Sequence, residues 1–149
     1  MRVPSVAFHH TAIVVTDIER SIAFYGQHFA AVLEMQLRHV GGRDVAALHR
    51  LAEVDFDLAF LAIGGGRLEL FEFHVPRSTT DNRSASSFGL SHVAFEVDDL
   101  HARYSEMREL GVHFTAPPLE LSDDTAPGFV IAFCSDPDGN QVELLQTPA

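Results

Sequence analysis

Two histidines and two glutamates stand at matched places in the two halves of the chain. His10 and His92 each open a segment that reads His-x-Ala-apolar-x-Val-x-Asp, and the two segments lie 82 positions apart. Glu69 and Glu143 each lie in a segment that reads Gly-x-x-apolar-Glu-Leu, and these are 74 positions apart. Two imidazoles and two carboxylates that meet at one point can bind a divalent metal of the Zn, Ni, Co, Mn or Fe type. The spacing therefore predicts a duplicated module, and a metal centre if the four side chains meet.

The first strand and the helix that follows it are predicted in both halves. Val6–Val15 and Leu90–Val97 have the β-branched and aromatic content of strands. Asp17 and Asp99 come next and are good N-cap residues for a helix. Gly111 stands where the second helix should end. Apolar side chains recur at helical spacing in both segments, at Ile18, Ile22, Tyr25 and Phe29 and at Leu100, Tyr104, Met107 and Leu110.

Three further strand-like segments follow in each half, so that each half reads βαβββ. They are Val32–Val40, Phe56–Ile63 and Arg67–Phe73 in the first half, and Phe114, Val130–Cys134 and Gln141–Gln146 in the second. The predicted fold class is α+β, with one domain over residues 1–149 built from modules 5–74 and 90–148 and a linker at 75–89.

Two segments between these elements are predicted to be irregular. His74–Phe88 is rich in Pro, Ser, Thr and Asn with little apolar content, which is typical of a linker. Thr115–Gly128 carries three prolines and an acidic stretch, and is predicted to be a long loop. Two interpretations are open for this loop: a lid over a binding site, or an acidic loop that is simply exposed to solvent.

Strand alternation places the four repeated side chains on the less apolar face of their strands. A pseudo-twofold relation between the modules would bring them together, whereas the alternative is that each is an ordinary half-exposed residue. His9 competes with His10, because a slip of one residue turns the strand over. Glu72 and Glu96 are lesser carboxylate candidates. The remaining histidines have no repeat partner and are interpreted as surface residues: His28, His39, His49, His74, His101 and His113.

Composition excludes several classes of function. The chain has 149 residues and a net charge of −11, and all ten basic residues are Arg, so a nucleic-acid partner and Schiff-base chemistry on a lysine are not expected. The apolar runs are too short to span a membrane, and the first ten residues do not resemble a secretory signal. Cys134 is the only cysteine, which excludes an internal disulfide and favours a cytoplasmic location.

These motifs resemble the vicinal oxygen chelate superfamily of glyoxalase, bleomycin resistance protein and dioxygenase type, over nearly the whole chain. The residues that carry the resemblance are segment 10–17 with Ser21, Phe24 and Tyr25, then Leu68–Phe71, Gly89–Phe95 and Asp136–Leu144. The resemblance implies two βαβββ modules whose mixed sheets form a cup around a metal, often within a homodimer. By resemblance, the metal ligands would be His10, Glu69, His92 and Glu143, and the ion would be Ni, Zn or Co, with Mn or Fe also accepted.

The resemblance also implies an activity on a small molecule. A glyoxalase I-like lyase or isomerase would stabilise an enolate of a small oxygenated substrate, with Glu143 as the first candidate for the base and Glu69 opposite it. Arg38 is the candidate for the group that would bind a glutathione carboxylate. A second possibility is a binding protein, metal-free or with a structural metal, that sequesters an aromatic drug or natural product against Phe71, Phe73, Phe129 and Phe133. A third is an extradiol-type dioxygenase, which the additional carboxylate Glu69 disfavours.

Overall fold

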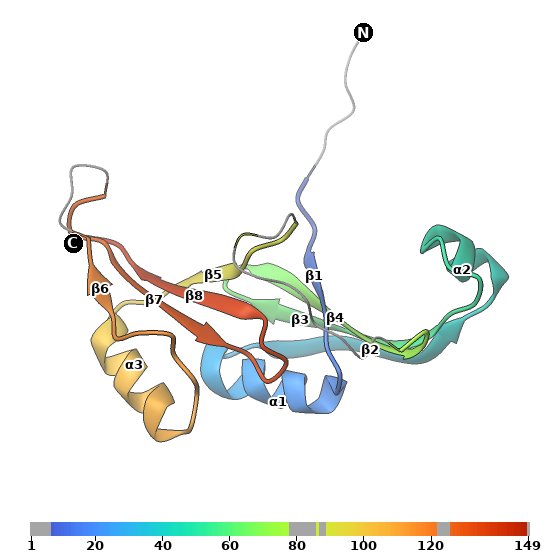
Figure 1. The fold of residues 1–149 in the computed structure, drawn as a ribbon, viewed down its shortest axis with the longest axis horizontal. Coiled ribbons are helices and arrows are strands. Elements are labelled where there is room, and N and C mark those ends of the chain that lie inside the picture. Colours follow the sequence, from blue (N-terminus) through green and yellow to red (C-terminus); the bar gives the residue numbers. More distant parts are fainter. Residues whose placement is uncertain (1–6, 78–85, 87–88, 122–125, 149) are drawn as a thin grey trace, which may run out of the picture. The chain divides into compact units, whose positions relative to one another are not determined.

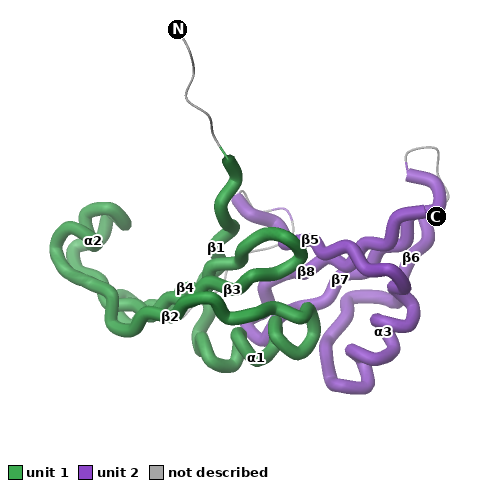
Figure 2. Tube along the Cα trace, turned by 180° about the vertical axis from the view of Figure 1, so that it is seen from behind, with its two compact units in different colours: residues 1–79 green, residues 80–149 purple. Residues whose placement is uncertain are grey.

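The computed structural model describes residues 7–77, 86, 89–121 and 126–148 of the chain (Figure 1). The chain divides into two compact units, residues Met1–Thr79 and Thr80–Ala149, which Figure 2 colours separately. Each unit contains one four-stranded sheet within the described ranges. Among these residues, no helix is long and apolar enough to cross a membrane.

The first unit is a mixed sheet with two helices. Its strands lie in the order β1-β4-β3-β2, with β1 parallel to β4 and the other neighbours antiparallel. A parallel pair needs a crossover connection, and the chain between β1 and β4 provides it. The elements are β1 (Thr11–Val14), α1 (Ile18–Phe29), β2 (Val32–Gly41), α2 (Arg43–Leu48), β3 (Asp55–Ile63) and β4 (Gly66–Val75).

The second unit has the same strand topology. Its order is β5-β8-β7-β6, and β5 is parallel to β8. The α+β class and the repeated βαβββ order predicted from the sequence are thus confirmed. The elements are β5 (Val93–Glu96), α3 (Leu100–Glu109), β6 (Leu119–Glu120), β7 (Val130–Ser135) and β8 (Gln141–Gln146).

The two main helices begin in the same way. The carboxylate of Asp17 accepts a hydrogen bond from the backbone N–H of Arg20, and that of Asp99 accepts one from Ala102, each at 3.0 Å. Both aspartates are in extended backbone conformation, as an N-cap requires. The predicted N-caps are confirmed.

A second acceptor at each helix start comes from the last strand of the unit. Glu72 Oε2 accepts from the N–H of Ile18 at 2.9 Å, and Gln146 Oε1 accepts from that of Leu100 at 2.8 Å. The sequence offers Glu72 as a lesser carboxylate candidate, but in the structure its carboxylate caps the first N–H of α1. Glu96, the other lesser candidate, accepts a hydrogen bond from the Thr147 hydroxyl.

Each unit has a core between its sheet and its main helix, and the first unit has a further buried cluster on the other face of its sheet, at Ala46, Val54, Phe56 and Leu58. In the first unit Ile18 and Tyr25 of α1 are fully buried, as are Ala59 and Leu61 of β3. Burial of each large apolar side chain contributes about 1.5–3 kcal/mol. The corresponding fully buried residues of the second unit are Leu100, Met107, Cys134, Val142 and Leu144.

Several predicted details differ from the structure. The short helix α2 and the two-residue strand β6 were not predicted, and Phe114 forms only an isolated bridge to Cys134. His28 was interpreted as a surface residue, but it is 5% exposed because it continues the buried face of α1. Residues 78–85, 87 and 88 of the predicted linker and 122–125 of the predicted loop lie outside the described residues.

Candidate metal centre

His10 and Glu69 lie side by side in the first unit. His10 Nε2 is 3.0 Å from Glu69 Oε2, with the imidazole one-third exposed and the carboxylate 9% exposed. The parallel pairing of β1 with β4 places Ala12 opposite Glu69. His10 is two residues before Ala12 and shares its face of the sheet, so its side chain lies next to Glu69.

His92 and Glu143 repeat this arrangement in the second unit. His92 Nε2 is 3.0 Å from Glu143 Oε2, and the two side chains are 34% and 18% exposed. Here Ala94 of β5 lies opposite Glu143 of β8. The structure therefore brings together the predicted residues of each unit in pairs. The prediction that the two pairs meet at one ion concerns both units, and it stays a prediction.

A phenylalanine completes each pair, and only one of the two was expected from the sequence. Phe60 lies opposite Glu69 in the β3–β4 register, and Phe133 lies opposite Glu143 in the β7–β8 register. Each ring meets the neighbouring imidazole edge to face, with centroids 5.1 Å apart for His10 and 5.4 Å for His92. Phe60 was missed, although the dipeptide Ala-Phe recurs 73 positions later at Phe133.

The second ring nitrogen of each histidine faces a neighbour in the chain. His10 Nδ1 is 2.7 Å from His9 Nδ1, and His92 Nδ1 is 3.3 Å from the Ser91 hydroxyl oxygen. Such contacts orient an imidazole and leave its Nε2 as the donor for a metal. Of the two adjacent histidines, it is His10 whose ring reaches Glu69, in line with the repeat alignment.

Glu69 is the most buried of the four side chains. Burial raises the pKa of its carboxyl group, while the imidazoles of His10, His49 and His9 act in the opposite direction. A carboxylate with a raised pKa holds a proton at higher pH than a surface glutamate does, which suits a group that exchanges protons with a substrate.

The donor set fits a divalent metal ion. Each pair offers one imidazole nitrogen and one carboxylate oxygen, which are ligands that Zn, Ni and Co accept. An octahedral ion with bonds of about 2.1 Å holds neighbouring donors about 3.0 Å apart. This is the separation found in both pairs.

Aromatic side chains share the Glu69 face of the first sheet. Phe71 and Phe73 stack with centroids 5.8 Å apart, and Phe56 meets Phe71 edge to face at 5.0 Å. His49 contacts all three rings. Two of the four predicted lining residues thus form one cluster, while Phe129 is half-buried just before β7.

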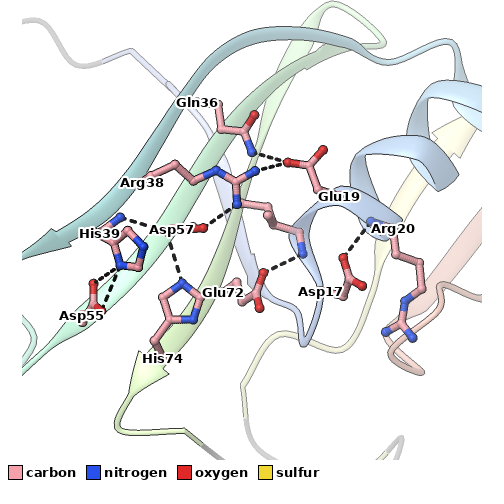
Figure 3. A network of polar contacts seen from close by, with 11 residues as sticks. Asp17, Glu19, Arg20, Gln36, Arg38, His39, Asp55, Asp57, Glu72 and His74 are labelled. Atoms are coloured by element: carbon pink, nitrogen blue, oxygen red, sulfur yellow. Dashed lines mark hydrogen bonds and ion pairs between the residues drawn. The ribbon is translucent and has the colours of Figure 1, made fainter.

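Arg38 has other partners than the expected substrate carboxylate. Its guanidinium donates to Asp57 Oδ2 at 2.5 Å and to Glu19 (Figure 3). These acidic groups lie on the α1 side of the sheet, opposite to the face that carries Glu69, since Asp57 alternates with Ala59 and Leu61.

Two units with the same strand topology and one histidine–glutamate pair in each define an α+β protein built from paired modules. The model of the Glyoxalase/Bleomycin resistance protein/Dioxygenase superfamily matches residues 7–144. The chain therefore belongs to this family.

Named relatives include two enzyme classes. The chain is 29% identical to a 2-epi-5-epi-valiolone epimerase of Actinomyces sp, over 97% of this chain and 81% of the relative. It is also 29% identical to a probable lactoylglutathione lyase of Vibrio cholerae serotype O1, over 92% of this chain and 88% of the relative.

Solved structures share the fold. A glyoxalase family protein from Bacillus cereus superposes with a TM-score of 0.82 at 18% identity and covers 99% of this chain and 98% of its own. Glyoxalase I from Zea mays superposes with a TM-score of 0.65 at 25% identity, over 94% of this chain and 44% of that longer one.

Proposed function

We propose that the chain is a divalent-metal-dependent enzyme that moves a proton at a carbon next to a carbonyl group of a small oxygenated substrate. The observation that carries this proposal is the repeated His–Glu pair, with the same 3.0 Å separation in both units. In this proposal His10, Glu69, His92 and Glu143 hold one ion, Ni, Zn or Co, with Mn or Fe also accepted. A bound divalent ion polarises a carbonyl oxygen and stabilises the negative charge of an enolate.

The two glutamates would divide the proton transfer between them. Glu143 is the more exposed carboxylate and would take the proton from the carbon, while Glu69 on the opposite side would return one. His10 and His92 would hold the ion through their Nε2 atoms, next to these carboxylates. Phe60 and Phe133 would exclude water beside the imidazoles. The names of the relatives, a lactoylglutathione lyase and a 2-epi-5-epi-valiolone epimerase, agree with this chemistry, because moving a proton next to a carbonyl can serve both a lyase and an epimerase.

A binding role without catalysis is the second candidate. The half-buried rings of Phe71 and Phe73 on the Glu69 face favour it, because aromatic side chains bind aromatic ligands by stacking; Phe56 beside them is buried in the core. Under this alternative an aromatic ligand would bind equally well to protein from which metal has been stripped.

Metal content and proton exchange together test the proposal. Purified protein should contain about one Ni, Co or Zn per chain by plasma mass spectrometry, and it should exchange the α-proton of lactoylglutathione or of an α-hydroxy ketone for deuterium from D₂O. Glu143→Gln should abolish the exchange and weaken metal retention, whereas Glu109→Gln, an exposed residue of α3, should change neither. Folded protein that retains no offered metal would refute the enzyme. Iron together with oxygen consumption would point to the dioxygenase instead.

A further inference from the structure

A second group of metal-ligating side chains lies on the α1 side of the first sheet. His39 of β2, Asp57 of β3 and His74 of β4 each offer a ligand atom, and these atoms lie within 4.8 Å of one another (Figure 3). The group is on the opposite face of the sheet from Glu69, so it is separate from the His–Glu pairs. Neither histidine has a repeat partner, and both were interpreted from the sequence as surface residues.

Two interruptions of the strand register flank Asp57. In the β2–β3 pair, Leu37 lies opposite Leu58 and Val40 opposite Phe56, so Arg38 and His39 both face Asp57. In the β3–β4 pair, Phe73 lies opposite Phe56 and Val75 opposite Asp55, so His74 is an extra residue. A β-bulge turns a side chain out of the regular alternation and is common next to functional sites. Here the β2–β3 bulge places His39 opposite Asp57 as an extra residue, while His74 shares the Asp57 face because it alternates with Glu72, which lies opposite Asp57.

The backbone at His39 is in an unusual conformation. Its φ angle is 51°, in the left-handed region that residues other than glycine rarely adopt. In this conformation its N–H donates to Asp57 Oδ1 at 2.8 Å, and its ring Nδ1 lies 3.2 Å from Asp55 Oδ2. The contact of Nδ1 with a carboxylate leaves Nε2 as the donor, which is a common arrangement for histidines that bind metals.

The Asp57 carboxylate and one ring nitrogen of His74 are buried. The Asp57 side chain is 4% exposed, and His74 Nε2 lies 3.2 Å from its Oδ1. This nitrogen is itself buried, and within the described part of the chain it forms no hydrogen bond of good geometry. Arg38 occupies the other oxygen, Oδ2, and so fixes the orientation of the carboxylate. Asp57 Oδ1 and His74 Nε2 thus face each other at the candidate site.

We propose that His39, Asp57 and His74 form a second binding site, for a divalent transition metal of the Zn²⁺ class. Two imidazoles and one carboxylate are a common ligand set for such ions, and the fourth position would be filled by water. The ion would replace the direct contact between His74 and Asp57. It would join three neighbouring strands at one end of the first sheet, so its role is to stabilise that end.

Zinc titration of metal-free protein tests this site independently of the proposed enzyme centre. The background variant is His10→Ala/His92→Ala, which removes one donor from each His–Glu pair. Isothermal titration calorimetry should find one Zn²⁺ per chain in this background. His74→Ala or His39→Ala added to it should lower the affinity for Zn²⁺ by at least about 100-fold. Loss of a residue that only orients a ligand costs about 10–100-fold, and loss of a ligand itself should cost no less. His113→Ala, an exposed histidine of the second unit, should leave the affinity unchanged.

The opposite results would overturn the proposal. If the background variant binds no zinc, or if His39→Ala and His74→Ala bind it as the background does, the three residues form an ion-pair network only. Circular dichroism of each variant checks that it is folded. Co²⁺ absorption gives a second readout, because the visible bands of the bound ion should disappear with His74→Ala while the spectrum of the His113→Ala variant stays the same.

Discussion

Replacement of Asp57 by asparagine should destabilise the metal-free protein in a pH-dependent way. The carboxylate accepts hydrogen bonds from the His39 N–H and from Arg38, and it lies beside His74. Asparagine has the same size, and its oxygen can still accept from the His39 N–H. What the variant loses is the negative charge between Arg38 and the imidazole, in a side chain that is almost fully buried.

The pKa of Asp57 sets the size of the effect. Burial by itself raises this pKa, but the His39 N–H, Arg38 and His74 outweigh burial and lower it from 3.8 to about 2. A lowered pKa in the folded state means that the charge stabilises the protein above the pKa of the unfolded chain and that this stability is lost as the pH falls toward 2. The shift corresponds to about 2 kcal/mol at neutral pH and to roughly half of that near pH 3.

Urea denaturation with EDTA present, at neutral pH and near pH 3, measures this difference. Asp57→Asn should lie about 2 kcal/mol below the wild type at neutral pH, and the gap should narrow at the lower pH. Asp55→Asn is the matched control on the same strand. Its side chain is 35% exposed and, among the described residues, pairs with His39, so the variant should lose less than about 0.5 kcal/mol. Equal losses for the two variants, or a gap that does not change with pH, would show that the Asp57 charge does not stabilise the fold.

Three further outcomes are expected. Asp17→Ala and Asp99→Ala should each lower the free energy of unfolding by about 1 kcal/mol, because each removes the acceptor at a helix start; an unchanged urea midpoint for both would contradict the N-caps. The Cys134 thiol should stay unreactive toward a disulfide reagent such as Ellman's reagent until the protein unfolds, since burial raises its pKa to about 12; fast labelling of folded protein would argue against its buried position. Removal of metal by EDTA should abolish deuterium exchange into the substrate, and Ni, Co or Zn should restore it; exchange that survives with no metal detectable by plasma mass spectrometry would argue against the metal-dependent mechanism.

The duplication made much of the fold predictable. The same spacing recurs between halves, so each segment could be checked against its counterpart, and the predicted strand Gln141–Gln146 is found with the same bounds. The alignment also favoured His10 over His9, which strand alternation alone could not decide, and His10 is the residue that contacts Glu69. Local pattern and long-range pairing agree at these positions, which is why single-sequence reasoning works there.

Features present in only one half were harder to find. Helix α2 (Arg43–Leu48) is only six residues long, and the described residues of the second unit contain no equivalent helix. His39 and His74 were dismissed because nothing matched them at the repeat spacing. A bulge interrupts the period of two on which strand reasoning depends, so the sequence pattern cannot show that His39 lies opposite Asp57. Alternation does place His74 on the Asp57 face, but the sequence does not show which residue of β3 it faces.

The second unit shows that the fold itself does not require a carboxylate at this place. Phe60 and Phe133 are equivalent, so Asp57 corresponds to Val130, three residues before Phe133. Both positions lie opposite equivalent residues of the last strand, Glu72 and Gln146. Val130 is buried at 7% exposure, and apolar residues often replace buried charges without loss of stability. Among the described residues, the carboxylate, the two bulges and the left-handed histidine therefore occur in the first unit and not in the second, which agrees with the proposed ligand. If the zinc titration fails, the double variant Asp57→Val/Arg38→Gln should be at least as stable as the wild type in urea denaturation, because a buried ion pair is then replaced by neutral side chains with no ligand lost.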